Sequence, residues 1–185
     1  MININDIKNG MTILYEGNIY QIVEFQHVKP GKGSAFVRTK LKNLRTNSTI
    51  DITFNAGIDV ERAIVTKSEL SYLYNQGDMY VFMDNETYEQ LEIHKKQLED
   101  QIKFLKEGLV VLVIKYEDEL IGIELPEKIS YKITYTEPAV KGNTTSSAQK
   151  DATIETGHVL KVPLFINEGD EIIVTTRDGK YSSRA

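Results

Sequence analysis

Short segments rich in β-branched and aromatic residues recur along the chain about 8–12 residues apart, and this spacing constrains the fold most. Turn residues separate the segments. They predict strands at 18–25, 34–44, 49–54, 63–66, 69–74, 79–83, 109–116, 120–125, 129–135, 158–162, 171–175 and 179–182. Many short strands with little helix between them favour small barrels. They exclude a doubly wound sheet, in which helices alternate with the strands.

Helical periodicity is confined to the middle of the chain. Leu98, Ile102 and Leu105 recur at helical spacing before Gly108, a residue type that commonly ends a helix. Residues 85–89 read as a turn that opens a second short helix. We therefore predict one or two short helices, both in the middle third.

Turn and breaker signals near residues 64 and 128 divide the chain. We predict an all-β protein of three small barrel domains, at 1–64, 65–128 and 129–185. The segment 141–151 is polar and without pattern, so we expect a loop there.

The composition excludes several kinds of chemistry. The chain has no cysteine, so disulfides, thiolate metal sites and thiol catalysis are impossible. The three histidines are far apart in the sequence, and we expect neither a metal site nor a cofactor. No secretory signal is visible, and no apolar stretch nears the roughly 20 residues that span a bilayer. We expect a cytoplasmic protein with no membrane partner.

Charge is distributed unevenly along the chain. Residues 1–64 carry 8 basic and 6 acidic side chains, 65–128 carry 7 and 14, and 129–185 carry 7 and 7. Between residues 25 and 50 there is no acid. The bases there are Lys29, Lys32, Arg38, Lys40, Lys42 and Arg45. Such a patch on an acidic protein indicates either a surface for nucleic-acid phosphate or a solvated basic face.

The patch is organised around one predicted hairpin. In the strand 34–44, Arg38, Lys40 and Lys42 fall on one face, and Val37, Thr39 and Leu41 fall on the other. The tip loop before it contains Lys29, Pro30, Gly31, Lys32, Gly33 and Ser34. Pro-Gly suits a type II turn, with Gly31 supplying the positive φ. Lys32 is then an exposed cation between two glycines, or simply a solvated turn lysine.

Other chemical candidates are weak. Gly33 stands where a phosphate-binding P-loop needs Ser or Thr after Lys32, and no Gly-x-Ser-x-Gly motif occurs. Asp78, Asp84 and Glu86 suit surface turns better than a metal site, and His27 suits a strand better than acid–base catalysis.

The basic segment and several later ones resemble bacterial elongation factor P. The resemblance runs in order from end to end of the chain. It is carried by the segments 27–44, 73–75, 83–90, 152–157, 162–166, 168–170 and 178–184. The resemblance implies an SH3/KOW-like N-terminal barrel followed by two OB-folds, in an L-shaped arrangement like that of tRNA.

The resemblance also implies a function. Members of this family bind both ribosomal subunits beside peptidyl-tRNA in the P site and relieve stalling at consecutive prolines. They are not enzymes; they stimulate the ribosomal peptidyl transferase. In many members the tip residue, which corresponds to Lys32, is extended by a modifying enzyme. We expect a monomer in which Lys32, once lengthened, contacts the CCA end of the tRNA. We also expect Arg38, Lys40, Lys42 and Arg45 to meet RNA phosphate.

The third domain departs from the family's pattern. Asn143 stands where Asp is common, and Asp151 where Pro is common. The resemblance implies contacts of Asn143 and Thr144 with the exit-site codon, although the loop departs from the family's pattern there. Tyr181 and Arg184 would lie in the domain nearest the small subunit, or could equally close the barrel.

Two other functions stay open from the sequence. One is a single-stranded RNA-binding module that acts away from the ribosome, since OB-folds commonly bind such strands. The other is an enzyme that uses the acidic residues of the middle third.

Overall fold

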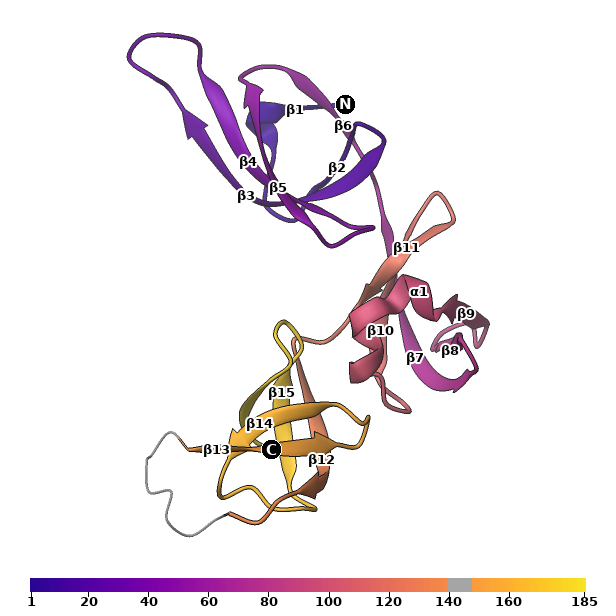
Figure 1. The fold of residues 1–185 in the computed structure, drawn as a ribbon. Coiled ribbons are helices and arrows are strands. Elements are labelled where there is room, and N and C mark those ends of the chain that lie inside the picture. The colour runs from indigo at the N-terminus through magenta and orange to yellow at the C-terminus, as the bar shows by residue number, and fades with distance from the viewer. Residues whose placement is uncertain (140–147) are drawn as a thin grey trace. The chain divides into compact units, whose positions relative to one another are not determined.

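The computed structural model describes residues 1–139 and 148–185. It contains three sheets and little helix, so the predicted all-β class is confirmed. The chain forms two compact units. The first comprises Met1–Lys67 and Val113–Gly122, and the second comprises Ser68–Leu112 and Ile123–Ala185. Figure 1 shows the strands along the chain.

The first sheet has six strands in the order β1-β6-β2-β3-β4-β5. Their bounds are Ile2–Asn3 (β1), Thr12–Tyr15 (β2), Asn18–Val28 (β3), Phe36–Asn43 (β4), Thr49–Asn55 (β5) and Asp59–Arg62 (β6). A 3₁₀ turn, Ile4–Asp6, follows β1. Apolar side chains from most of these strands form one core, with Ile13, Ile22 and Leu41 almost fully buried. Burial alternates clearly along β4, as expected for a strand with one face on the core.

The second sheet has the order β11-β10-β7-β8-β9. Its strands are Thr66–Gln76 (β7), Met79–Asp84 (β8), Gln90–His94 (β9), Val110–Tyr116 (β10) and Glu119–Glu124 (β11). A short helix, α1 (Lys95–Leu98), and a 3₁₀ helix, η2 (Glu99–Phe104), follow β9.

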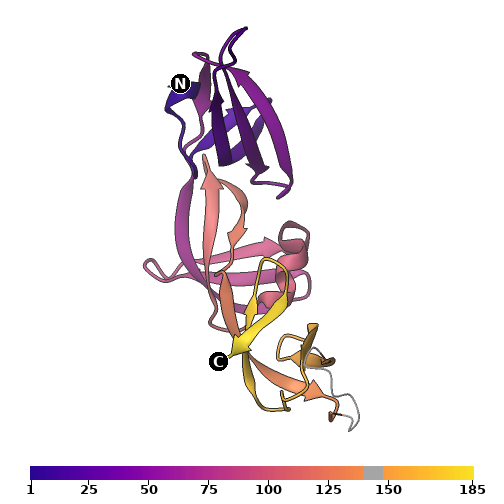
Figure 2. The same cartoon turned by 90° about the vertical axis from the view of Figure 1, so that its left-hand side faces the viewer.

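The third sheet has the order β14-β13-β12-β15-β16. Its strands are Lys128–Thr136 (β12), Gln149–Ile154 (β13), Val159–Pro163 (β14), Glu171–Thr175 (β15) and Lys180–Arg184 (β16). They twist around a core of their own (Figure 2), in which Tyr131, Ile133 and Val174 are fully buried. Phe104 of η2 belongs to this core, and the Tyr131 hydroxyl donates to the Phe104 carbonyl at 2.5 Å.

The predicted helices need correction. The helix expected through Leu98, Ile102 and Leu105 ends at Leu98, because Glu99 has a positive φ of 47°. The segment continues as the 3₁₀ helix η2 instead. The turn at 85–89 opens strand β9 and not a helix. Its shape is set by the Asp84 carboxylate, which accepts from the backbone N–H groups of Glu86 and Thr87 at 2.7 and 3.0 Å.

Two predicted boundaries also fail. Residues 63–65 are not a strand, since the chain there passes from β6 to β7 and buries Ala63. Residues 149–151, expected in a loop, begin β13. Lys150 pairs with Val162 of β14, and Asp151 pairs with Lys161. Pairing with β14 makes this polar segment a strand, and the local composition does not reveal that pairing.

Candidate nucleic-acid interface

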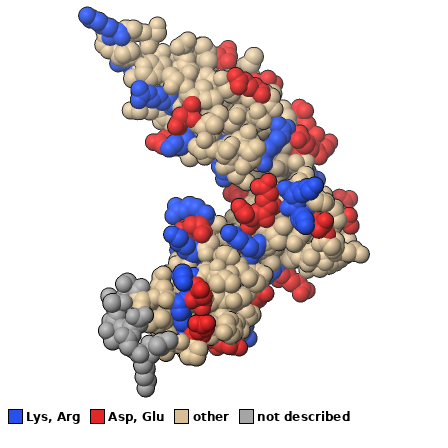
Figure 3. All heavy atoms as spheres, in the orientation of Figure 1, with Lys and Arg blue, Asp and Glu red and all other residues tan. Residues whose placement is uncertain are grey.

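The tip loop joins the two longest strands of the first sheet, β3 and β4. These strands pair antiparallel from Tyr20 opposite Asn43 to Val28 opposite Phe36. We call the paired β3 and β4, with the loop between them, the finger. Gly31 to Ser34 are exposed, and so is the Lys32 side chain. The loop stands at the free end of the finger in Figure 1, and basic side chains mark that end in Figure 3.

The tip is not the predicted type II turn. Gly31, which such a turn would place at positive φ, lacks it, whereas Gly33 has a φ of 109°. The reversal is spread over residues 29–35, which are bends and coil between the strand ends. A longer loop does not need the two-residue geometry of a Pro-Gly turn. The conformational need for glycine therefore falls after Lys32, at Gly33.

The predicted faces of β4 are confirmed. Val37, Thr39 and Leu41 are buried, whereas Arg38 and Lys40 are exposed and Lys42 is half-buried. The bases face outward because the alternate positions fill the barrel core.

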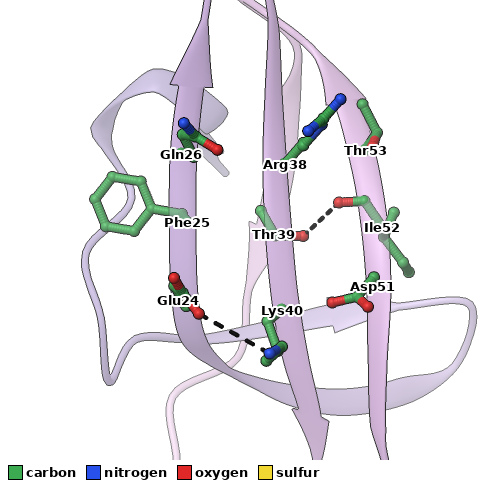
Figure 4. A pocket seen from close by; sticks show the side chains of 9 residues that line it. All are labelled: Glu24, Phe25, Gln26, Arg38, Thr39, Lys40, Asp51, Ile52 and Thr53. Carbon is green, nitrogen blue, oxygen red and sulfur yellow. Dashed lines mark hydrogen bonds and ion pairs between the residues drawn. The ribbon is translucent and has the colours of Figure 1, made fainter.

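The neighbours of the two exposed bases differ. Arg38 lies opposite Gln26 of β3 and Thr53 of β5, which are both uncharged. Lys40 lies opposite Glu24 and Asp51, which are both acidic. The two rows border a hollow of about 420 Å³ on this face (Figure 4). The Arg38 guanidinium also lies 5.5 Å from the Phe36 ring centroid, in cation–π range.

The residues predicted to contact RNA therefore differ in the charge of their neighbours. The Lys40 Nζ is 4.0 Å from the Glu24 carboxylate, so part of its charge is compensated within the protein. Lys42 lies opposite Gln21 and Thr49, with no acid directly across from it. Sequence spacing within one strand does not reveal these cross-strand partners, although strand alternation identifies the side chains that share the face.

Arg45 lies in the turn after β4 and has different partners. Its guanidinium contacts the Glu119 carboxylate at 2.9 and 3.3 Å and donates to the Gly17 carbonyl at 3.1 Å. Its charge is therefore already paired.

The remaining candidates lie in the third sheet or outside the described residues. Tyr181 of β16 packs against the third core. The Arg184 guanidinium pairs with Asp170 at 3.2 Å and lies 5.6 Å from the Phe165 ring centroid. Asn143 and Thr144 lie outside the described residues.

The residues weighed for other chemistry have local structural partners. His27 lies in β3 opposite Val37, with its ring 5.4 Å from that of Phe25. Asp78 pairs with Lys95 at 3.1 Å. Within residues 1–139 and 148–185, no three His, Asp or Glu side chains gather as metal ligands. Over the same residues, no helix has the length and apolarity that crossing a bilayer requires.

The fold is a barrel with a basic finger followed by further small β-domains, and solved translation factors share it. The "Eukaryotic translation initiation factor 5A from Methanococcus jannaschii" is similar with a TM-score of 0.52 and 26% identity, over 68% of this chain and 90% of that one. A "translation initiation factor eif-5a family protein" from Naegleria fowleri shares the fold with a TM-score of 0.51 and 17% identity, over 67% of this chain and 96% of its own.

Sequence comparisons define the family. Residues 3–60 match the family described as "Elongation factor P (EF-P) KOW-like domain", 65–123 match the "OB domain" and 129–184 match "Elongation factor P, C-terminal". "Elongation factor P" of Aster yellows witches'-broom phytoplasma is 60% identical over all of this chain and 98% of its own. The protein of the same name from Moorella thermoacetica is 54% identical over the full length of both. The chain belongs to the elongation factor P family of translation factors, as the resemblance predicted.

Proposed function

We propose that this protein binds the ribosome beside peptidyl-tRNA in the P site and stimulates peptide-bond formation at consecutive prolines. The exposure of Lys32 in the loop that joins the two longest strands of the first sheet carries the proposal. Family membership supports the same role.

Proline is a slow acceptor of the peptide because its amine is secondary and its φ is fixed. Correct placement of two reactants is worth up to about 7–11 kcal/mol in favourable systems. A factor that steadies the CCA end of the tRNA needs to supply only a small part of that. In this proposal Lys32, lengthened by a modifying enzyme, contacts the CCA end, and the ribosome performs the bond chemistry.

The outward face of the finger would position the protein on RNA. Arg38 has uncharged cross-strand neighbours and Lys42 has no acid opposite it, so both are free to meet phosphate. Such contacts hold RNA without reading its sequence. We keep Lys40 as a weaker contact of the same kind. We also propose that the chain divides into domains at residues 64 and 128. The protein is proposed to be a cytoplasmic monomer.

The third domain would face the small subunit. Tyr181 and Arg184 lie on its last strand, β16. The Arg184 side chain is 55% exposed although it pairs with Asp170, so it keeps surface for such a contact.

The test compares Lys32→Ala with Lys29→Ala in the same tip loop. Each variant removes one positive charge from the loop, but only Lys32→Ala removes the side chain that is proposed to contact the CCA end. Lys32→Ala is expected to leave thermal unfolding unchanged and to abolish the stimulation of diproline synthesis on purified ribosomes, while Lys29→Ala retains most of it. Normal stimulation by Lys32→Ala would overturn the proposal. Cosedimentation with free RNA but not with ribosomes would favour a non-ribosomal RNA-binding module instead.

A further inference from the structure

The hairpin formed by β10 and β11 belongs to the first compact unit over Val113–Gly122. Its Ile114 and Ile121 are buried in a small apolar cluster with Ile19 and Ala63 of the barrel. The hairpin is thus attached to the barrel that carries the finger, although it lies 50 or more residues further along the chain.

Arg45 fastens the exposed end of this hairpin. Its Nη2 lies 2.9 Å from Glu119 Oε2, and its Nε lies 3.3 Å from Glu119 Oε1. This two-point contact uses the planar fork that arginine presents to a carboxylate. Nη1 donates to the Gly17 carbonyl at 3.1 Å. One guanidinium therefore joins three segments: its own turn, the β2–β3 turn and the hairpin.

The turn that carries Arg45 is itself fixed. The side-chain oxygen of Asn43, a buried residue, accepts from the backbone N–H groups of Arg45 and Thr46 at 2.9 and 3.2 Å. The Leu44 N–H donates to the Ile19 carbonyl at 2.9 Å. Because the backbone is held on both sides, the arginine side chain starts from a defined position and loses less entropy when it binds Glu119.

We propose that Arg45 is a positioning residue that locks the β10–β11 hairpin onto the first barrel, and is not an RNA contact. To bind phosphate, Arg45 would have to release Glu119 and Gly17. The chain crosses between the two units at three places, after Lys67, Leu112 and Gly122. Two of these, after Leu112 and after Gly122, bound the hairpin.

Any effect of this lock on activity rests on the proposed function. A rigid attachment of the hairpin to the barrel affects activity only if Lys32 must reach a defined target. The lock itself can be measured in the free protein. The pair is partly exposed, with relative exposures of 33% for Arg45 and 54% for Glu119. Partly exposed pairs of this kind contribute modestly, so a local measurement is more sensitive than global unfolding.

The experiment is a charge swap. Hydrogen exchange of the amides in 113–122 is compared in the parent protein, Arg45→Glu, Glu119→Arg and the double variant, with Arg38→Glu as the matched control. Each single variant at the pair is expected to raise exchange of these amides about 1.5- to 5-fold. The double variant should return it at least halfway, and Arg38→Glu should leave it unchanged. Unchanged exchange in both single variants, or no recovery in the double variant, would overturn the lock.

Diproline synthesis on ribosomes separates the lock from an RNA contact. The lock predicts that the double variant regains activity although position 45 is now acidic. It also predicts that Arg45→Lys, which keeps the charge but loses the fork, is impaired. Restored exchange without restored activity would make the charge at position 45 the essential feature and overturn the proposal. If Lys32→Ala is fully active, the proposed function fails, while the exchange data still decide whether the lock exists.

Discussion

Lys40 lies directly opposite Glu24 in the β3–β4 ladder, with its Nζ 4.0 Å from the carboxylate. Two positions along the same face, Arg38 lies opposite the uncharged Gln26. Two adjacent bases on one strand therefore present different net charge to a partner. Because the Glu24–Lys40 pair is well exposed, it compensates the lysine only in part.

We expect Arg38→Ala to weaken ribosome binding more than Lys40→Ala. One lost phosphate contact lowers the slope of log affinity against log salt by about 0.7–0.9. Arg38→Ala should show a decrease of that size, and Lys40→Ala less than half of it. Binding titrations at several salt concentrations measure both slopes. Equal slopes for the two variants would show that the cross-strand acids do not matter.

The two glycines of the tip should differ in tolerance to substitution. Gly33 has a φ of 109°, where a Cβ is strained at a cost of about 1–2 kcal/mol, whereas Gly31 is not at positive φ and has open space around a Cβ. Gly33→Ala should therefore move Lys32 and reduce diproline synthesis, while Gly31→Ala stays near normal. Urea unfolding of both should stay within about 1 kcal/mol of the parent, because an exposed loop relaxes locally. If Gly31→Ala were the less active variant, the result would support the Pro-Gly turn that the sequence predicts.

The turn of the β10–β11 hairpin is suboptimal for its conformation. Glu117 and Asp118 both have positive φ, at 48° and 66°, in a two-residue connection where Asn-Gly is preferred. Replacing both, as E117N/D118G, should stabilise the protein by about 1 kcal/mol because the left-handed conformations become less costly. Urea unfolding measures the gain. The control Glu117→Gln removes a charge but not the strain, so an equal gain there would assign the effect to charge.

Tyr131 should contribute to stability through its hydroxyl. The ring is fully buried and the hydroxyl donates to the Phe104 carbonyl. Tyr131→Phe leaves that carbonyl without its partner and should cost about 1–3 kcal/mol in urea unfolding at pH 8. Tyr131→Leu, which also changes the packing, should cost more than Tyr131→Phe. A neutral Tyr131→Phe would mean that the bond adds nothing to the packed ring.

The same residue predicts a pH dependence. Burial, with a smaller effect from Glu155, raises the pKa of the Tyr131 hydroxyl well above its ordinary value. A raised pKa in the folded state favours the protonated form. Its contribution is complete below the unfolded pKa of about 10 and is lost as pH rises above it. The unfolding free energy should therefore decrease less between pH 8 and pH 11 in Tyr131→Phe than in the parent. Equal decreases would contradict the assignment of this pH dependence to Tyr131.

Much of the fold and of the finger could be predicted because the deciding signals are local. Alternation along β4 placed Val37 inside and Arg38 outside, and the glycines around Lys32 marked an exposed loop. Long-range pairing was not predictable in this way. Glu119 is 74 residues from Arg45, and no pattern near either residue indicates the contact. Asp151 was expected in a loop because the segment around it is polar, yet pairing with Lys161 places it in a strand.

The sequence predicts positive φ at Gly31, the glycine before Lys32. The structure has positive φ at Gly33 instead, because the loop is longer than a tight turn requires. The residue types at the apex indicated a bend without indicating which residue adopts positive φ. That choice depends on how the ends of β3 and β4 are spaced, which is a property of the whole barrel.

The exposure of residues 31–34 has a practical consequence for protein engineering. An apex that buries almost nothing contributes little to the folding energy of the barrel beneath it. Foreign peptides, unnatural amino acids or fluorescent labels grafted between the ends of β3 and β4 should therefore be displayed on an intact scaffold.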